Sequence, residues 1–435
     1  MENIVIIGQG GREHSLGDKL SQSSEISHIF YSQGNAGTEE GKGINLFLDG
    51  TKKENFGKLY DFVMHANIKT IIVGSEIPSS DGIVNFFHSK KYYNIFAPTR
   101  EAACLETDKF FSYDLMSALR ISQADSVKCF SIEEAIKAIK KRPKNGGVVI
   151  KARGLTGGKG VTVCESIKHA LHKVKEHCNA YGFENLIAER LYGDEFSVFG
   201  ISDGKTVCPI EISVQDHKRL LDGNKGINTG GMGSYSPVAF AQSSVVRNIN
   251  EHIMKPVVQK MKEIGYEYKG FLYAGMIMTK DGPKVLEFNA RLGDPECQSL
   301  MMMLKNDFYI PIKLALEGEI KNYKIEFNPG ASCCLALTAR GYPDNKSETY
   351  QKSQGLEIMG INEADKIKGV KVFHGGTIRF EETIRVNGGR ILYPTSYSEN
   401  GIAQAQKLAY EAASKIYVSG GFYWRRDIAD KAIKN

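Results

Sequence analysis

The first hundred residues alternate short apolar runs with amphipathic segments. The apolar runs are rich in Ile, Val and Phe and predict strands at residues 3–8, 27–34, 69–76 and 93–99. Segments between them, such as residues 12–20, mix charged and apolar positions as helices do. Short apolar strands separated by helices are typical of a parallel sheet with both faces covered. We therefore expect an N-terminal Rossmann-like domain over residues 1–103.

The pattern changes near residue 104. Apolar positions at helical spacing predict helices over residues 108–120 and 131–142. Ser131 with Glu134 three residues later has the form of a capping box at the start of the second helix. Strands alternate with helices beyond this point, so we expect a second domain over residues 104–325.

Residues 215–237 are polar and rich in glycine, and no periodic element suits them. Long loops of this kind are usually functional or disordered. Met232, Tyr235 and Pro237 favour an ordered functional loop, although a disordered insertion is the alternative.

After residue 326 the chain reads as a third region. Strand-like runs at residues 330–343, 371–380 and 388–396 precede an amphipathic helix over residues 401–417. We expect a small, β-rich C-terminal domain over residues 326–435.

Composition narrows the class of protein. The chain has 435 residues with 56 basic and 50 acidic side chains, a net charge of +6, and no Lys/Arg block that would indicate nucleic acid. A basic pocket for a phosphorylated small molecule fits better. The eight cysteines form no C-x-x-C motif, and no apolar stretch nears the ~20 residues of a membrane span. We expect a cytoplasmic enzyme without a signal peptide or a membrane partner.

The segment VLEFNAR carries candidate metal ligands. Side chains alternate along a strand, so Glu287 and Asn289 are expected on one face, with Leu286 and Phe288 in the core. A carboxylate and an amide oxygen suit Mg²⁺. Arg291 continues on the same face and could meet an anionic group. A solvated polar face without a metal is the alternative.

The segment KARGLTGGKGV predicts a phosphate-binding flap. Lys151 ends a strand, and Lys159 lies among the glycines Gly154, Gly157, Gly158 and Gly160. Glycines let backbone N–H groups approach phosphate oxygens, and the lysines add positive charge. The Walker A pattern is absent from this sequence, and the glycines join two strands. A merely flexible hairpin is the alternative.

The opening turn GQGGREHSLG raises the question of a dinucleotide. The pattern G-x-G-x-x-G needs a glycine at position 13, which is Glu13 here, and no acidic residue ends the second strand. An NAD-binding oxidoreductase therefore stays only as an alternative. A catalytically dead scaffold is a further one, although Lys151, Glu287 and Asn289 are all present.

Together these segments resemble the ATP-grasp superfamily and, within it, the phosphoribosylamine–glycine ligase family. The resemblance runs through almost the whole chain, on GQGGREH, SQGNAGT, VGSEIP, LETDKFF, VIKARGLTGGKGV, QDHKR, NTGGMGSYSP, GFLYAGMIM, EFNARLGDPE and FHGGT. It implies a multidomain α/β and α+β protein. A central ATP-grasp fold, with a mobile lid subdomain at about residues 122–190, would follow the Rossmann-like domain.

The resemblance also implies an activity. ATP, glycine and 5-phosphoribosylamine would give glycinamide ribonucleotide, ADP and phosphate through a glycyl phosphate, in the second step of de novo purine synthesis. The cofactors would be ATP and Mg²⁺ or Mn²⁺. The partners would be these small molecules alone, and the enzyme would be a monomer or a weak dimer.

Site residues follow from the resemblance position by position. It implies catalytic roles for Asp216, Lys218, Arg291 and Asp294, and metal ligation by Glu287 and Asn289. It places ATP on Lys109, Lys151, the flap residues Gly154, Gly157, Gly158, Lys159 and Gly160, and Glu189, Leu191 and Glu195. It places the sugar phosphate on Gly10, Gly11, Asn35, Gly37 and Glu76. The loop residues Asn228, Thr229, Gly230, Gly231 and Met232 complete the site.

The chain departs from the family pattern in places. Arg153 stands where an aspartate is usual, and Thr156–Gly157 replace two alanines. Ser75 and Ala188 replace a proline and a glutamate. None of these changes removes a reacting group, but Arg153, Thr156 and Gly157 put the dynamics of the flap and its nucleotide affinity in question.

Overall fold

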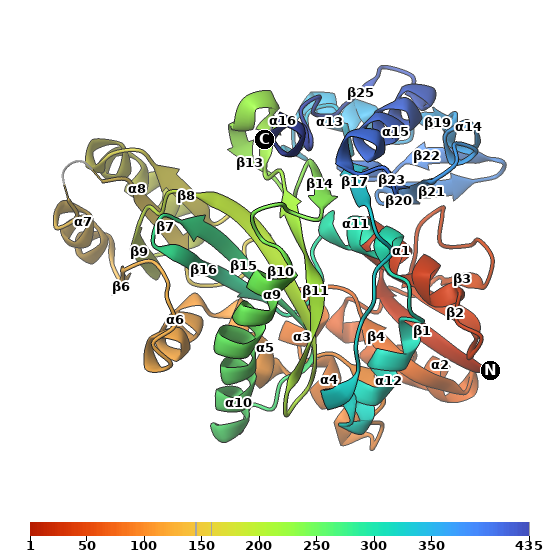
Figure 1. Ribbon diagram of the computed structural model, residues 1–435, viewed down its shortest axis with the longest axis horizontal. Helices are drawn as coiled ribbons and strands as arrows, with labels where there is room; N and C mark the ends of the chain where they lie inside the picture. Colours follow the sequence, from red (N-terminus) through yellow and green to blue (C-terminus); the bar gives the residue numbers. More distant parts are fainter. Residues whose placement is uncertain (144–145, 158, 435) are drawn as a thin grey trace.

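A computed structural model describes residues 1–143, 146–157 and 159–434. The N-terminal part is a parallel sheet in the order β3-β2-β1-β4-β5, red to orange in Figure 1. Its strands are β1 (Glu2–Gly8), β2 (Ile26–Gln33), β3 (Gly43–Leu46), β4 (Ile68–Val73) and β5 (Ile95–Phe96). Its helices are α1 (Gly11–Ser21), α2 (Phe56–His65), α3 (Glu76–Ser80) and α4 (Ile83–Ser89).

Helices cover both faces of this sheet, as the sequence predicts. Ile4 and Ile6 of β1 face one core with Leu16 of α1. Val5 and Ile7 face the other core, which includes residues of α2 and α4. Alternate residues of one strand thus enter two cores, which explains why the strand is apolar throughout. The Rossmann-like expectation is confirmed; the short β3 was missed.

A small antiparallel sheet in the order β6-β9-β7-β8 stands apart at the left of Figure 1. It has its own hydrophobic core, built with Ala135, Ile139 and Val174. The Ser131 hydroxyl caps the first helix by accepting from Glu134 N–H, while Glu134 accepts from Phe130 N–H. The elements are β6 (Ser126–Cys129), α7 (Ile132–Lys140), β7 (Val148–Ala152), β8 (Val161–Cys164), α8 (Ile167–Tyr181) and β9 (Asn185–Glu189).

One large sheet joins the middle of the chain to its C-terminal part, in the order β16-β15-β10-β11-β14-β17-β23-β18-β25. The central strands are β10 (Asp194–Asp203), β11 (Val207–Asp216), β14 (Gly233–Ser236), β15 (Lys269–Thr279) and β16 (Gly282–Asn289). Central helices are α5 (Arg100–Thr107), α6 (Lys109–Ala118), α9 (Ser243–Ile249), α10 (Lys255–Glu263), α11 (Glu296–Met303) and α12 (Tyr309–Glu317).

The C-terminal part extends this sheet with β17 (Ala331–Leu335), β18 (Leu337–Ala339), β20 (Val370–His374), β23 (Arg390–Ser398) and β25 (Phe422–Tyr423). A second sheet contains β19 (Glu357–Met359), β21 (Thr377–Phe380), β22 (Thr383–Val386) and β24 (Tyr417–Val418). The helices are α13 (Glu348–Ser353), α14 (Ile361–Asp365), α15 (Ile402–Lys415) and α16 (Asp430–Lys434).

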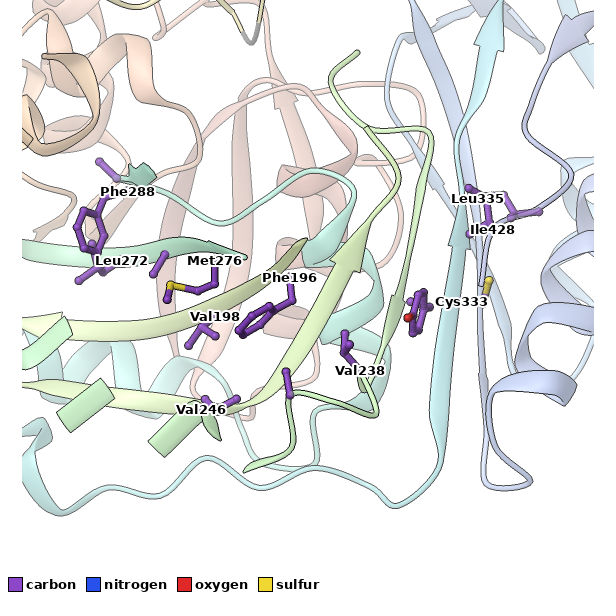
Figure 2. Packing of buried hydrophobic residues seen from close by; sticks show 14 of the residues in the cluster. Phe196, Val198, Val238, Val246, Leu272, Met276, Phe288, Cys333, Leu335 and Ile428 are labelled. Atoms are coloured by element: carbon purple, nitrogen blue, oxygen red, sulfur yellow. The ribbon is translucent and has the colours of Figure 1, made fainter. Parts of the chain in front are cut away.

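The largest core runs along the big sheet (Figure 2). Phe196, Leu272 and Met276 of the central strands lie in the same cluster as Leu335 of β17 and Ile428 near the C-terminus. The expected division between residues 325 and 326 therefore crosses one continuous sheet and one continuous core. We keep it as a proposed domain boundary in the chain. None of the helices that the structure describes is long and apolar enough to span a membrane.

The expectation that residues 215–237 contain no regular element is wrong. Within this segment, β12 (Arg219–Leu221) and β13 (Lys225–Asn228) form a short hairpin, and β14 joins the large sheet. These strands are three or four residues long, and the structure holds them by contacts with distant parts of the chain. Periodicity cannot detect strands so short.

Two buried histidines join the N-terminal and C-terminal parts. The ring of His14 accepts a hydrogen bond from the backbone N–H of His374 at 2.8 Å, and Thr377 lies 3.0 Å from the His374 ring. Burial lowers the pKa of His14 well below its usual value, with help from His374 and Lys371. Burial, followed by Lys371 and Arg379, lowers the pKa of His374 to about 3. Both rings are therefore neutral in the folded protein.

Acid is expected to loosen this junction. The unfolded chain binds protons at both histidines below a pH of about 6.5, which the folded chain does not, so their stabilising contribution is present above that pH and lost below it. As the pH falls from 7.5 to 5.5, each histidine should lower the free energy of unfolding by about 1 kcal/mol. Urea denaturation at both pH values tests this. A His374→Asn variant should lose part of the pH dependence, whereas the exposed His65→Asn should keep it; equal slopes in all three would contradict the assignment.

Candidate active site

A cleft of about 1140 Å³ lies between the small sheet β6-β9-β7-β8 and the large sheet. The predicted residues along it are Glu76, Lys151, Gly157, Glu189, Leu191, Glu195, Asp216, Lys218, Asn228, Thr229, Gly230, Glu287, Asn289, Arg291 and Asp294. Lys109 lines a smaller adjoining pocket that shares Lys151 and Glu287 with the cleft. Residues separated by more than two hundred positions in sequence thus face one space.

Strand β16 places Glu287 and Asn289 in the cleft, as the alternation of side chains predicts. Phe288 is buried in the large core. Leu286, expected beside it in the core, instead lines the cleft, because the pairing of β15 with β16 shifts at this residue. Such a bulge turns a side chain away from its alternating position.

The oxygens of Glu287 and Asn289 suit a hard cation. Burial opposes the charge on Glu287, but Lys218, Lys151 and Lys109 hold its pKa below the usual value, so the carboxylate is ionised. Among the described residues, no group of three or more His, Cys, Asp or Glu side chains could hold a metal alone. Two protein oxygens fit a Mg²⁺-type ion that takes its other ligands from water and phosphate.

Two lysines lie near the Glu287 carboxylate. Lys151, on β7, donates to the carbonyl of Leu286 at 3.0 Å, and Lys109, at the start of α6, donates to that of Gly154 at 3.1 Å. Burial lowers the pKa of both, and Glu287 opposes this shift. Partly desolvated lysines facing a carboxylate form a suitable setting for phosphate oxygens with a bridging cation.

Arg291 connects the cleft to the N-terminal part of the chain. Its guanidinium lies 3.2 Å from the Glu76 carboxylate and 3.4 Å from that of Glu106. Burial, opposed by Arg291, raises the pKa of Glu106 to about 7. Arg291 and Arg12 hold the pKa of Glu76 below its usual value despite burial. Arg291 therefore has one ionised partner and one that changes charge near neutral pH.

The loop across the cleft contributes Asp216 and Lys218. Lys218 pairs with Glu195 at 3.0 Å, and this contact raises the pKa of Lys218 although burial opposes its charge. Burial, followed by the neighbouring Glu296 carboxylate, raises the pKa of Asp216 well above its usual value. Asp216 Oδ1 is buried and accepts no hydrogen bond from the described residues.

Asp294 is held by an arginine that the sequence did not reveal. Arg390, from β23, donates to the Asp294 carboxylate at 3.0 Å and to the Gly230 carbonyl at 2.6 Å. Asp294 lies beside Gly10, because a Cβ built on Gly10 would lie 3.7 Å from Asp294 Oδ2. Arg390 thus links the C-terminal part to both sides of the cleft.

The turn before α1 contains a buried glutamate side chain. Glu13 is 2% exposed, and its carboxylate accepts from the backbone N–H of Gly10 and from Arg12 Nε, each at 2.8 Å. A Cβ on Gly8 or Gly74 would lie within 2.6 Å of this side chain. The Glu13 side chain therefore fills the turn at the start of α1, where dinucleotide folds bind a pyrophosphate. This arrangement does not fit the oxidoreductase alternative.

The comparisons with known proteins agree with this geometry. Residues 2–106, 107–297 and 332–431 match the N domain, the ATP-grasp (A) domain and the C domain of phosphoribosylglycinamide synthetase. The chain belongs to the phosphoribosylglycinamide synthetase family.

Relatives of this synthetase family match over the full chain. Proteins named phosphoribosylamine–glycine ligase from Rhodopirellula baltica and Pseudomonas syringae are 38% and 39% identical, over 99% of this chain and 98% of each relative. A crystal structure of the Thermotoga maritima ligase superposes with a TM-score of 0.82 at 30% identity, over 98% of this chain and 100% of that one. A Hydrogenobacter thermophilus biotin carboxylase domain, at a TM-score of 0.70 and 14% identity, shares the fold. The expected ATP-grasp fold is confirmed.

Several residues that the synthetase resemblance singled out lie outside the lining of the cleft. Asn35 donates to the carbonyls of Gln9 and His374 at 2.8 and 2.9 Å, and Gly37 packs between His14 and His374. Gly10 and Gly11 lie on the turn described above. Two further predicted residues, Gly231 and Met232, are buried. The predicted flap contains Gly154, Lys159 and Gly160, whereas Gly158 falls outside the described residues. Their roles stay predictions.

Arg153, which departs from the synthetase pattern, has a structural role at the base of the flap. Its guanidinium donates to both carboxylate oxygens of Asp108, including 3.0 Å contacts from Nε, and lies 3.1 Å from Glu184. Asp108 is also the N-cap of α6, which begins at Lys109. Arg153 therefore connects the base of the predicted flap to helix α6, whose first residue is Lys109.

Sequence reasoning missed several residues in or beside the cleft, among them Arg12, Glu106, Tyr273, Glu296, Arg390, Arg425 and Asp427. Each meets a partner far away in the chain; for example, Glu106 accepts from the N–H of Ala290 at 2.6 Å. No local motif could have indicated these contacts.

Proposed function

We propose that the protein ligates glycine to 5-phosphoribosylamine, forming glycinamide ribonucleotide while ATP becomes ADP and phosphate, as a step of purine synthesis. The observation that carries the proposal is one cleft that brings Lys151, Glu287 and Asn289 together with Arg291 and the loop at Asp216 and Lys218. The full-length relatives with the name phosphoribosylamine–glycine ligase support the choice of substrates.

The chemistry requires activation of a carboxylate. Glycine cannot acylate an amine directly, because its carboxylate would have to expel oxide, which is a poor leaving group. We propose that its carboxylate takes the γ-phosphoryl group, and that the amine of phosphoribosylamine then displaces phosphate from the glycyl phosphate. The protein's contribution to such a reaction is positioning and charge neutralisation.

The residues divide this work between them. Lys109 and Lys151 would neutralise the phosphates, while Glu287 and Asn289 would hold Mg²⁺ or Mn²⁺. A bound divalent cation would offset charge on the transferring phosphoryl group. Arg291 would bind the glycine carboxylate or the acyl phosphate formed from it.

The other predicted contacts complete the proposal. Glu189 and Leu191 would bind adenine, and Glu195 the ribose, for which it must release Lys218. The released Lys218, with Asp216 and Asp294, would then face the reacting groups. Gly10, Gly11, Asn35, Gly37 and Glu76 would bind the sugar phosphate, and the remaining flap and loop residues would close over the nucleotide.

The proposal also covers the setting of the enzyme. All eight cysteines are free thiols and seven of them are buried, which suits a reducing compartment such as the cytoplasm. We propose small-molecule partners only and a monomer or weak dimer.

An omission assay tests the reaction. ATP consumption should require glycine, phosphoribosylamine and a divalent metal together, with the labile amine generated in the assay. Glycinamide ribonucleotide, detected by mass spectrometry, should form in proportion to ADP. ATP turnover that persists unchanged without glycine would rule out the ligase.

A further inference from the structure

Near the C-terminus, an ion pair that the proposed chemistry does not use joins a buried arginine to a partly exposed aspartate. Arg425 is 1% exposed, and its Nε and Nη2 each donate to one carboxylate oxygen of Asp427 at 2.7 Å. Despite burial, Arg425 and the Gly223 N–H lower the pKa of Asp427 to about 2, so the pair is ionised. Bidentate pairs of this kind fix geometry as well as charge. We call Arg425 and Asp427 the C-terminal clamp.

The clamp forms hydrogen bonds to the hairpin of residues 219–228. Arg425 Nη1 donates to the Arg219 carbonyl at 3.1 Å and to Asn224 Oδ1 at 3.0 Å. The Gly223 N–H donates to Asp427 at 2.8 Å. Next to the clamp, the backbone N–H of Arg426 donates to Asp222 at 2.9 Å. The first strand and the turn of the hairpin are thus held by residues about two hundred positions away.

The clamp itself is anchored on α15 and on the main core. The Tyr410 hydroxyl donates to the Arg425 carbonyl and accepts from the Ile428 N–H, each at 3.0 Å. Gln406 donates to the Ile428 carbonyl at 2.8 Å. Ile428 is fully buried close to Leu335 (Figure 2).

The hairpin has little support of its own. Its strands pair only at Arg219 with Asn228 and at Leu221 with Lys225. Isolated two-stranded hairpins are marginally stable in water. Without the clamp, the hairpin would therefore sample other positions.

The position of the hairpin determines that of Lys218. Lys218 directly precedes Arg219, whose carbonyl the clamp holds. The Lys218 carbonyl accepts from Thr229 N–H at 2.7 Å and from its hydroxyl at 3.0 Å, which closes the base of the hairpin. Both Lys218 and Thr229 line the cleft.

We propose that Arg425 and Asp427 are positioning residues, which hold the hairpin so that Lys218 faces the reacting groups across the cleft. This inference rests on the proposed function. It gives residues 425–427, which precede α16, a part in catalysis that the clamp would exert through Lys218.

The test compares Asp427→Asn with Arg426→Gln, a neighbouring exposed residue whose substitution leaves the backbone bond to Asp222 intact. Asp427→Asn should lower kcat by about 10-fold or more, since a catalytic group displaced by ~1 Å can cost ~100-fold. KM for ATP should change little, and amide exchange should rise within residues 219–228 only. Arg426→Gln should match the unmodified protein in all three.

Other outcomes would overturn the inference. A higher KM for ATP with unchanged exchange in the hairpin would mean that Asp427 contacts the nucleotide directly. Because Asp427→Asn could unfold the chain, Asp222→Ala serves as a second variant; it removes one exposed acceptor and should give a smaller loss of kcat with faster hairpin exchange. Unchanged kcat and exchange in Asp222→Ala and Asp427→Asn would refute the clamp. An unmodified protein without glycine-dependent turnover would contradict the proposed function instead, and the exchange data would still test the support of the hairpin.

Discussion

Replacing Glu287 with glutamine should lower turnover by at least about 100-fold and leave the fold intact. Glu287 is the ionised carboxylate near Lys109, Lys151 and Lys218, and it is one of the two oxygen ligands proposed for the cation. Glutamine keeps the shape but not the charge, so metal affinity should fall with kcat. Initial rates at saturating ATP and glycine, measured over a metal titration, give both quantities.

The control for this variant is Glu263→Gln, an exposed carboxylate on α10 that pairs with Lys260. It should keep normal turnover and metal dependence. Circular dichroism and the midpoint of thermal unfolding should be unchanged in both variants. Near-normal activity and metal affinity in Glu287→Gln would show that the cation is held elsewhere.

The second large effect is expected for Lys151→Met. Lys151 projects from β7 toward β16 and contacts the Leu286 carbonyl beside Glu287. Methionine keeps much of the apolar stem but removes the cation that would meet the phosphates. We expect the Kd for ATP to rise by about 10-fold or more, and kcat to fall as well, because charge on the transferring phosphoryl group loses a partner.

Calorimetric titration with a non-hydrolysable ATP analogue separates binding from chemistry here. Lys137→Met, at an exposed position of helix α7 outside the lining of the cleft, changes the same charge and should bind normally. If Lys151→Met bound the analogue as well as Lys137→Met does and turned over at the normal rate, Lys151 would have no role at the phosphates.

Local patterns in the sequence were enough to predict the strand that carries the proposed metal ligands. Alternation along β16 places Glu287 and Asn289 correctly because a strand fixes the direction of each side chain. The same rule failed at Leu286, where a bulge in pairing depends on the partner strand. The parallel N-terminal sheet was equally predictable, since its strands are apolar on both faces.

Contacts that depend on the tertiary fold could not be predicted. Arg390 meets Asp294 across 96 positions, and Glu106 meets Ala290 across 184. The hairpin at residues 219–228 exists largely through Arg425, 206 positions from Arg219. Glu13 was recognised as an obstacle to a dinucleotide, but only the structure shows its carboxylate filling the turn.

The large sheet also constrains how the protein can be made. Strand β14 lies between β11 and β17, and β17 pairs in turn with β23 at residues 390–398. A growing chain that has not yet reached residue 331 would leave the edge of β14 unpaired and the adjoining core open, and such an edge invites pairing with another chain. The centre of the protein therefore completes its folding only after β17 and β23 have been made, and chains that stop before residue 331 would be prone to aggregate.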